Sequence, residues 1–187
     1  MKDEAFFQGS IEYIQKKINQ ILDKVSTDVV NKIKKLFFKS NRIFVYGAGR
    51  SGLVAKAFAI RLVHLGYQTF VIGETITAPV AKGDLVVIVS GSGETIPAVM
   101  TAEIAHNLGA KVVSITAKKR SEIAKYADTT LFISASCNEE DRKKYAPLGT
   151  LFEASVWILL DGIIADLLES KHETEEDMRS RHATLEQ

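Results

Sequence analysis

The chain has 187 residues, of which 46% are hydrophobic and 25% charged, so it can bury a substantial core but is too short for two ordinary domains. Its formal net charge of +1, from 24 basic and 23 acidic residues, gives no electrostatic reason to expect nucleic acid or an anionic membrane as a partner. The single cysteine, Cys137, excludes an internal disulfide and is consistent with a reducing compartment.

The N-terminal part of the chain predicts a helical arm. Hydrophobic residues recur at steps of three and four from Ile11 to Phe38, as in an amphipathic helix. Ser26, Thr27 and Asp28 could cap a second helix, so the arm consists of one helix or two. The first ten residues contain no apolar leader, and we therefore expect a cytoplasmic protein.

After this arm, short apolar runs alternate with amphipathic segments. Strands are expected at 42–46, 68–72, 84–90, 111–115 and 129–134, and helices at 51–65, 94–108, 121–127 and 151–169. This alternation predicts an α/β fold, a three-layer α-β-α sandwich with a five-stranded parallel sheet. We expect one domain over 1–187, with the helical arm at 1–40, the core at 41–170 and a charged tail at 171–187 that includes a short helix near 173–181. The longest apolar stretch contains Asp161 and Asp166, so no membrane span is expected.

Two loops with similar sequences follow predicted strands. "YGAGRS" (46–51) and "SGSGET" (90–95) each contain Gly-x-Gly, then a charged residue and a hydroxyl residue, at the start of a predicted helix. Ligands bind at the carboxyl ends of parallel strands, and helix N-termini attract anions. The loops therefore predict a site for one phosphate group, with these candidate residues: Gly47, Gly49, Arg50, Ser51, Ser90, Gly91, Ser92, Gly93 and Thr95.

Two other interpretations of these loops stay open. Gly47, Gly49 and Gly52 match the dinucleotide pattern G-x-G-x-x-G, and Glu74 lies near the acidic position that this pattern requires ~20 residues later. The second, serine-rich loop is not part of that pattern. Alternatively, both loops are only tight turns between a strand and a helix, with hydroxyl residues as caps.

The motifs "GAGRSG", "GET", "SGSGET", "PLGTLFE" and "RHATLE" together resemble the sugar isomerase (SIS) domain family. "RLVHLGY" and "PLGTLFE" are most similar to its 6-phospho-3-hexuloisomerase branch. The resemblance implies the fold predicted above and a homo-oligomer, dimer or tetramer, with active sites near subunit contacts. It also implies a phosphorylated sugar as substrate and no cofactor or metal. Such an enzyme would act in formaldehyde fixation or in pentose supply.

The reaction implied by the resemblance interconverts 3-hexulose 6-phosphate and fructose 6-phosphate through an enediolate, which requires a base and a phosphate clamp. The resemblance points to Glu153 in "GTLFE" as the base. From the sequence alone, Thr150 and Glu153 also match a capping box at the start of a helix. Arg50 could stabilise the enediolate or pair with phosphate, or it could form a surface ion pair.

Other polar residues have weaker assignments. By resemblance, His182 is the histidine that SIS isomerases place in the active site, often from a neighbouring subunit, where an imidazole can transfer protons near neutrality. Glu74 and Thr75 in "GET" are candidate contacts of the sugar. His64 is expected to cap the end of a helix, with a substrate contact as the alternative.

The alternatives to a hexulose phosphate isomerase share its phosphate site. Isomerases of arabinose 5-phosphate or heptose 7-phosphate use the same enediol chemistry, and SIS modules also occur as sugar-phosphate sensors without catalysis. Sensors of this kind normally carry a DNA-binding domain, for which 187 residues leave no room. Residues 135–149 show no periodicity and are expected to form a loop that covers the substrate.

Overall fold

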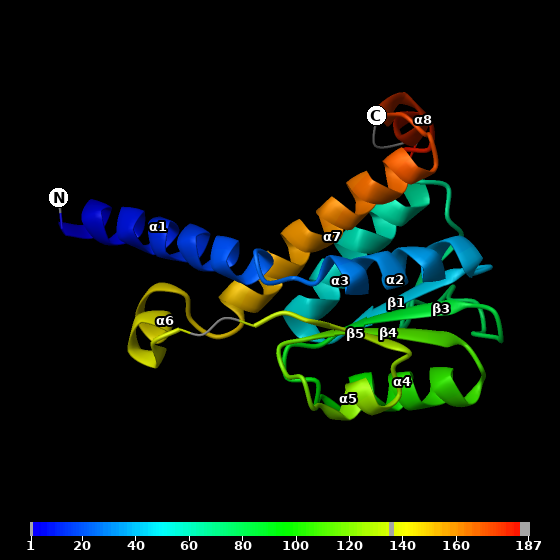
Figure 1. Cartoon of the computed structure of the whole chain (residues 1–187), viewed down its shortest axis with the longest axis horizontal. Coiled ribbons are helices and arrows are strands. Elements are labelled where there is room, and N and C mark those ends of the chain that lie inside the picture. Colours follow the sequence, from blue (N-terminus) through cyan, green and yellow to red (C-terminus); the bar gives the residue numbers. More distant parts are fainter. Residues whose placement is uncertain (1, 135–136, 184–187) are drawn as a thin grey trace.

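The computed structural model describes residues 2–134 and 137–183. In this part of the chain, one sheet of five parallel strands lies between two layers of helices (Figure 1). The strands are β1 (Ile43–Gly47), β2 (Thr69–Val71), β3 (Leu85–Val89), β4 (Lys111–Thr116) and β5 (Thr129–Phe132). The predicted α/β fold with a five-stranded parallel sheet is confirmed.

The helices divide between the two faces of the sheet. Figure 1 shows α1 (Lys2–Leu22), α2 (Thr27–Lys39), α3 (Gly49–His64) and α7 (Thr150–Ser170) on one side of the sheet. On the other side lie α4 (Ile96–Asn107) and α5 (Glu122–Lys125). The short helix α6 (Glu139–Tyr145) lies beside the N-terminal half of α1, and α8 (Glu175–Ser180) lies at the C-terminal end of α7.

Side chains of the strands alternate between two cores. In β3, which is buried along its whole length, Val87 and Val89 face the layer of α3 and α7, whereas Val86 and Ile88 face α4 and α5. In the second core, α4 contributes small residues such as Ala102. The continuous apolar runs predicted as buried strands are therefore buried on both faces.

The strand order is β2-β1-β3-β4-β5. The chain moves outward from β1 to β2 and then returns past β1 to β3, so the connections that leave β1 and β3 go to opposite faces. In open α/β sheets, this reversal creates a crevice at the carboxyl ends of the two strands. The loops at 46–51 and 90–95 lie at that point.

The amino-terminal edge of the sheet is held by a buried ion pair. Asp84, which is only 1% exposed, accepts hydrogen bonds from Arg42 Nη2 at 2.6 Å and from the Ala81 amide at 2.8 Å. The Arg42 Nε also donates to Asp84, at 3.1 Å. These contacts connect the residues before β1 and β3, at the edge opposite to the predicted phosphate loops.

The N-terminal arm forms two helices, one of the two arrangements expected from the sequence, with Ser26 as the N-cap of α2. Two segments differ from the expectation. The first helix, α1, begins at Lys2, earlier than the periodic stretch. Residues 135–149 were expected to be irregular, but they contain α6; residues 135–136 lie outside the described part. The α6 sequence, EEDRKKY, has six charged residues and one aromatic residue, which is why hydrophobic periodicity does not detect it.

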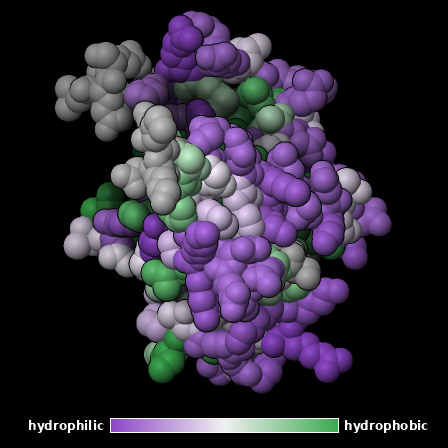
Figure 2. All heavy atoms as spheres, turned by 90° about the vertical axis from the view of Figure 1, so that its left-hand side faces the viewer, coloured by the Kyte–Doolittle hydropathy of each residue, from purple (hydrophilic) through white to green (hydrophobic). Residues whose placement is uncertain are grey.

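The surface differs between parts of the molecule. Figure 2 shows that the end carrying the start of α1 and α6 is largely hydrophilic, with small and separate apolar patches. Along α3 and α7, by contrast, the apolar side chains Leu53, Ile60, Trp157 and Ile158 are each about half exposed or more. Among the described residues, none of the helices has the length and apolar composition needed to cross a membrane.

Candidate functional site

A cavity of about 370 Å³ opens at the carboxyl ends of β1 and β3. Residues of both glycine loops line this cavity, together with the start of α7. Its lining residues are Ala48, Ser51, Val89, Ser90, Gly91, Ser92, Thr95, Ala117, Leu148, Gly149, Phe152 and Glu153. The structure therefore brings the two loops and Glu153 together around one space.

In the first loop, the glycines make the turn from β1 into α3 possible. Gly49 has φ +57°, a conformation that other residues rarely adopt. A Cβ on Gly47 would lie 2.6 Å from the Ser51 carbonyl oxygen, and one on Gly52 would lie 2.6 Å from the Gly47 carbonyl oxygen. Gly47, Gly49 and Gly52 thus allow strand and helix to approach closely, while Ser51 reaches the cavity.

In the second loop, the hydroxyl groups converge. Ser90 Oγ donates to Thr95 Oγ1 at 3.5 Å, and Ser92 Oγ lies 3.3 Å from the same oxygen. The backbone amide of Gly93 donates to Ser90 Oγ at 3.2 Å. Gly93 has φ +65° and its Cα lies against the Ser121 side chain, so the loop closes tightly over α5. Ser90, Ser92 and Thr95 form a compact set of hydroxyls that can bind anionic oxygens.

Three helices, α3, α4 and α7, begin beside this cavity. Their N-cap residues are Ala48, Thr95 and Gly149, and none of these three side chains makes a capping hydrogen bond. The amide groups of a first helical turn carry partial positive charge and lack partners within the helix. Their convergence on one cavity gives it an electrostatic preference for an anion without any lysine in its lining.

Glu153 lies in the first turn of α7 but does not form the capping box that its spacing suggests. The N-cap is Gly149 rather than Thr150, and Thr150 Oγ1 donates to the Pro147 carbonyl at 2.6 Å. The Glu153 carboxylate accepts a hydrogen bond from Arg50 Nε instead. Its side chain is 13% exposed, whereas that of Arg50 is 66% exposed. The carboxylate is therefore available at the cavity wall and is oriented by a guanidinium on α3.

Glu74 and Thr75 lie outside the lining of this cavity. Both are exposed, and Glu74 forms an ion pair with Lys56 at 2.5 Å. His106 and His172 are exposed. Glu74 and Thr75 stay predictions as contacts of the sugar.

His182 also lies elsewhere in the same chain. It stacks on His64, with ring centroids 4.9 Å apart and an interplanar angle of 28°, at the C-terminal end of α3. The two imidazoles border a cavity of about 210 Å³ together with Arg61 and Arg179. Residues 184–186 of "RHATLE" lie outside the described part of the chain. Within one chain, His182 and Glu153 therefore line different cavities.

Ion pairs hold the segment that carries His182. Arg181 Nη1 donates to the His64 carbonyl at 3.0 Å and to the Glu173 carboxylate at 2.5 Å. Lys171 donates to the Leu65 carbonyl and pairs with Glu173 at 3.0 Å. Burial raises the pKa of Glu173, but the hydrogen bonds from Arg181 and Lys171 outweigh burial and lower this pKa below its ordinary value. These cations satisfy the last carbonyls of α3, so this end of the helix is firmly capped.

Several lining residues were not among the predicted candidates. Leu148 and Gly149 lie in the quoted "PLGTLFE" motif, and Phe152 follows in the first turn of α7. Phe152 packs beside Gly91, where a Cβ would lie 3.1 Å from Cδ1 of the ring. The motif was the available signal for these residues, because no spacing rule connects residues 148–152 with the distant loops at 46–51 and 90–95. Among the described residues, no cluster of His, Cys, Asp and Glu could hold a metal ion.

Comparison with known proteins is consistent with this arrangement. The SIS domain family matches residues 36–154. A Bacillus subtilis protein named 3-hexulose-6-phosphate isomerase is 37% identical over 94% of this chain and 98% of its own length. One from Methylomonas aminofaciens with the same name is 38% identical over 94% and 97%. A Methanococcus jannaschii crystal structure, from which that isomerase function was inferred, has a TM-score of 0.84 at 30% identity and covers 94% of this chain and 98% of its own. This chain belongs to the SIS domain family.

Proposed function

We propose that the protein is an isomerase that interconverts 3-hexulose 6-phosphate and fructose 6-phosphate. The observation that carries this proposal is the cavity in which the hydroxyls of the second loop and the starts of α3, α4 and α7 surround the Glu153 carboxylate. The names of the relatives, which match nearly the whole chain, support the choice of substrate.

The proposed binding mode places the phosphate among Ser51, Ser90, Ser92 and Thr95. Hydroxyl groups and helix N-termini bind a phosphate dianion without needing a cofactor. The sugar then extends toward Glu153, and the fixed position of the phosphate sets which carbons lie beside the carboxylate. No nucleic acid or membrane is needed for this function, and the protein acts in the cytoplasm.

The proposed chemistry is a proton transfer between neighbouring carbons. Glu153 removes the proton from C2 of 3-hexulose 6-phosphate, and the C2–H electrons form a C2=C3 enediolate whose negative charge lies on O3. The same carboxyl group returns the proton to C3, while O2 loses its proton and O3 gains one, through solvent or another base, so that the carbonyl forms at C2 and a hydroxyl at C3. Arg50, held beside Glu153, stabilises the enediolate charge.

We further propose that a second copy completes the site. α3 has 16 residues and is about 24 Å long, so Arg50 and His64 lie at its opposite ends. The exposed apolar side chains Leu53, Ile60 and Trp157 lie between these ends. A two-fold axis across this surface would place α3 of the second copy antiparallel to α3 of the first. The end that carries His182 in the second copy would then lie near Glu153 of the first copy. His182 would then move protons between O2 and O3.

The proposed reaction is tested by incubating the protein with fructose 6-phosphate in heavy water. A 2,3-enediolate predicts carbon-bound deuterium at C3 of fructose 6-phosphate, and formation of the 3-hexulose. Isomerases that interconvert aldoses and ketoses form a 1,2-enediolate and label C1 instead. Label at C1 alone, or no label and no 3-hexulose, would contradict the proposal.

The phosphate site makes a separate prediction. Thr95→Val removes the hydroxyl that Ser90 and Ser92 approach, and we expect the KM for fructose 6-phosphate to rise about tenfold, the typical effect of one lost hydrogen bond to a charged group. Thr101→Val is the matched control, because the Thr101 hydroxyl donates to the Pro97 carbonyl within α4. Equal KM values in the two variants would count against a phosphate at Thr95.

A further inference from the structure

Leu148 combines two unusual properties at the rim of the cavity. It has φ +56°, a left-handed conformation that is unfavourable for a leucine, and its side chain is 89% exposed. Leu148 also lines the cavity, directly before Gly149, where a Cβ would lie 2.8 Å from Glu153 Oε1. A large apolar side chain is thus displayed to solvent beside the carboxylate, at a cost in backbone energy.

The turn around Leu148 has its residues in the unfavourable order. The Thr150 amide donates to the Pro147 carbonyl at 3.3 Å, which closes a turn with Leu148 and Gly149 at its centre. Gly149 has φ −85° and ψ 6°, so positive φ falls on the first central residue, as in a type II′ turn. Glycine is strongly preferred at that first position. Here the glycine occupies the second position and the leucine takes the strained one.

Neighbouring groups impose this conformation. Arg142 Nη1 donates to the Leu148 carbonyl at 3.2 Å, while its Nε and Nη2 bind the Glu139 carboxylate at 3.2 and 3.0 Å. Before the turn, Ala146 is fully buried in the core. Strained residues persist where surrounding contacts fix them, and such residues are concentrated in functional sites.

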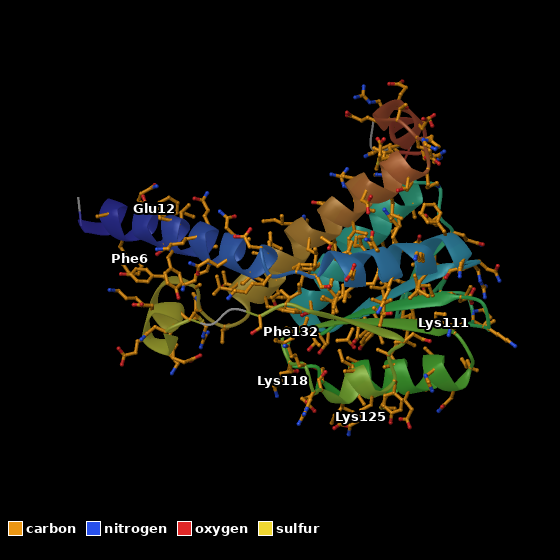
Figure 3. All side chains as sticks on the ribbon, in the orientation of Figure 1. Phe6, Glu12, Lys111, Lys118, Lys125 and Phe132 are labelled. Carbon is orange, nitrogen blue, oxygen red and sulfur yellow. The ribbon has the colours of Figure 1, made fainter. Side chains whose placement is uncertain are left out.

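The helix that carries Arg142 is itself attached to α1. Tyr145 stacks on Phe6 with ring centroids 5.5 Å apart and lies 5.4 Å from the Tyr13 ring. Figure 3 shows Phe6 on the side of α1 that faces α6. The N-terminal arm and α6 therefore form a support for the turn at Leu148.

We propose that Leu148 is a substrate-positioning residue, whose side chain packs on the carbon chain of the bound sugar phosphate and covers the carbons that face Glu153. This inference rests on the proposed function and adds to it an apolar contact beyond the phosphate site. An exposed leucine at the rim becomes buried when a ligand fills the cavity, and this burial contributes to affinity. Inorganic phosphate, which is too small to reach the rim, does not use this contact.

The test compares Leu148→Ala with Leu148→Gly in the full-length protein. Both variants lose the side chain, but only glycine relieves the positive φ. We expect both to weaken binding of fructose 6-phosphate about tenfold or more while leaving binding of inorganic phosphate unchanged. We expect only Leu148→Gly to raise the Tm, by about 2–4 °C. Leu108→Ala and Leu108→Gly, at an exposed leucine with φ −74° that is the C-cap of α4, are the controls and should raise neither the Kd values nor the Tm.

The outcomes separate this inference from the proposed function. Unchanged fructose 6-phosphate affinity in both Leu148 variants would overturn the positioning role. A Leu148→Gly protein no more stable than Leu148→Ala would contradict the claim that the backbone at Leu148 is strained. A wild-type protein that binds fructose 6-phosphate without labelling C3 would overturn only the proposed reaction. Arg142→Met should weaken sugar phosphate binding in the wild type but not in Leu148→Gly, because Arg142 acts through Leu148. If Arg142→Met weakened sugar phosphate binding equally in the wild type and in Leu148→Gly, this result would contradict an effect of Arg142 through Leu148.

Discussion

Glu153→Gln is expected to lower the rate of isomerisation by about 10²- to 10⁴-fold, because the amide cannot accept the carbon-bound proton. The same variant should abolish deuterium uptake at C3 of fructose 6-phosphate. Its side chain keeps the size of glutamate in the mostly buried position at the start of α7, and its partner Arg50 is largely exposed, so the fold should tolerate the change. Rates and label are measured together by NMR in heavy water.

The control for this variant is Glu122→Gln. Glu122 also lies in the first turn of a helix and pairs with an exposed cation, Lys125, at 2.6 Å, but it is not among the residues that line the cavity. It should keep wild-type activity. Binding of inorganic phosphate should be retained in Glu153→Gln, since the proposed phosphate site lies in the hydroxyl loop. A Glu153→Gln protein with more than about one-tenth of the wild-type rate would exclude this residue as the base.

His182→Gln is expected to lower the rate by about 100-fold, because no imidazole is then available to move protons between the two oxygens. Since His182 and Glu153 line different cavities of one chain, their cooperation requires a second copy. Coexpression of Glu153→Gln and His182→Gln chains should therefore restore activity. Random pairing would leave about one quarter of the sites with both residues intact.

The coexpression experiment separates cooperation between copies from cooperation within one chain. If both residues act within the same chain, every site in the mixture lacks one of them and activity stays at the level of the single variants. His172→Gln, at an exposed histidine of the same C-terminal segment, is the control and should be as active as the wild type. A wild-type protein that is monomeric and fully active would contradict the proposed role of a second copy.

The sequence predicted the centre of the sheet well because β3 is a continuous apolar run, Val86–Val89, that is buried on both faces. It also predicted which loops approach each other, since the carboxyl ends of parallel strands share one edge of the sheet. The helix α6 was missed because it has no apolar face; Asn138 caps it, and Glu139 pairs with Arg142 on its surface. A helix stabilised by local charge pairs of this kind shows no hydrophobic periodicity in its sequence.

Within the candidate site, the sequence was least informative where the contact partners are distant in the chain. The spacing of Thr150 and Glu153 predicted a capping box, whereas the structure pairs Glu153 with Arg50, 103 positions earlier. Local hydrogen bonds can be inferred from spacing, but an ion pair between α3 and α7 depends on how the two helices pack. The left-handed Leu148 has the same origin, because Arg142 and the buried Ala146 impose it against the local preference.

The Arg42–Asp84 ion pair has an evolutionary consequence. It ties together the beginnings of the two central strands, while the proposed chemistry occupies their other ends. The residues that hold the two central strands together are therefore different from the residues that carry the proposed chemistry. Substitutions in the loops can therefore change substrate preference while the Arg42–Asp84 ion pair stays intact.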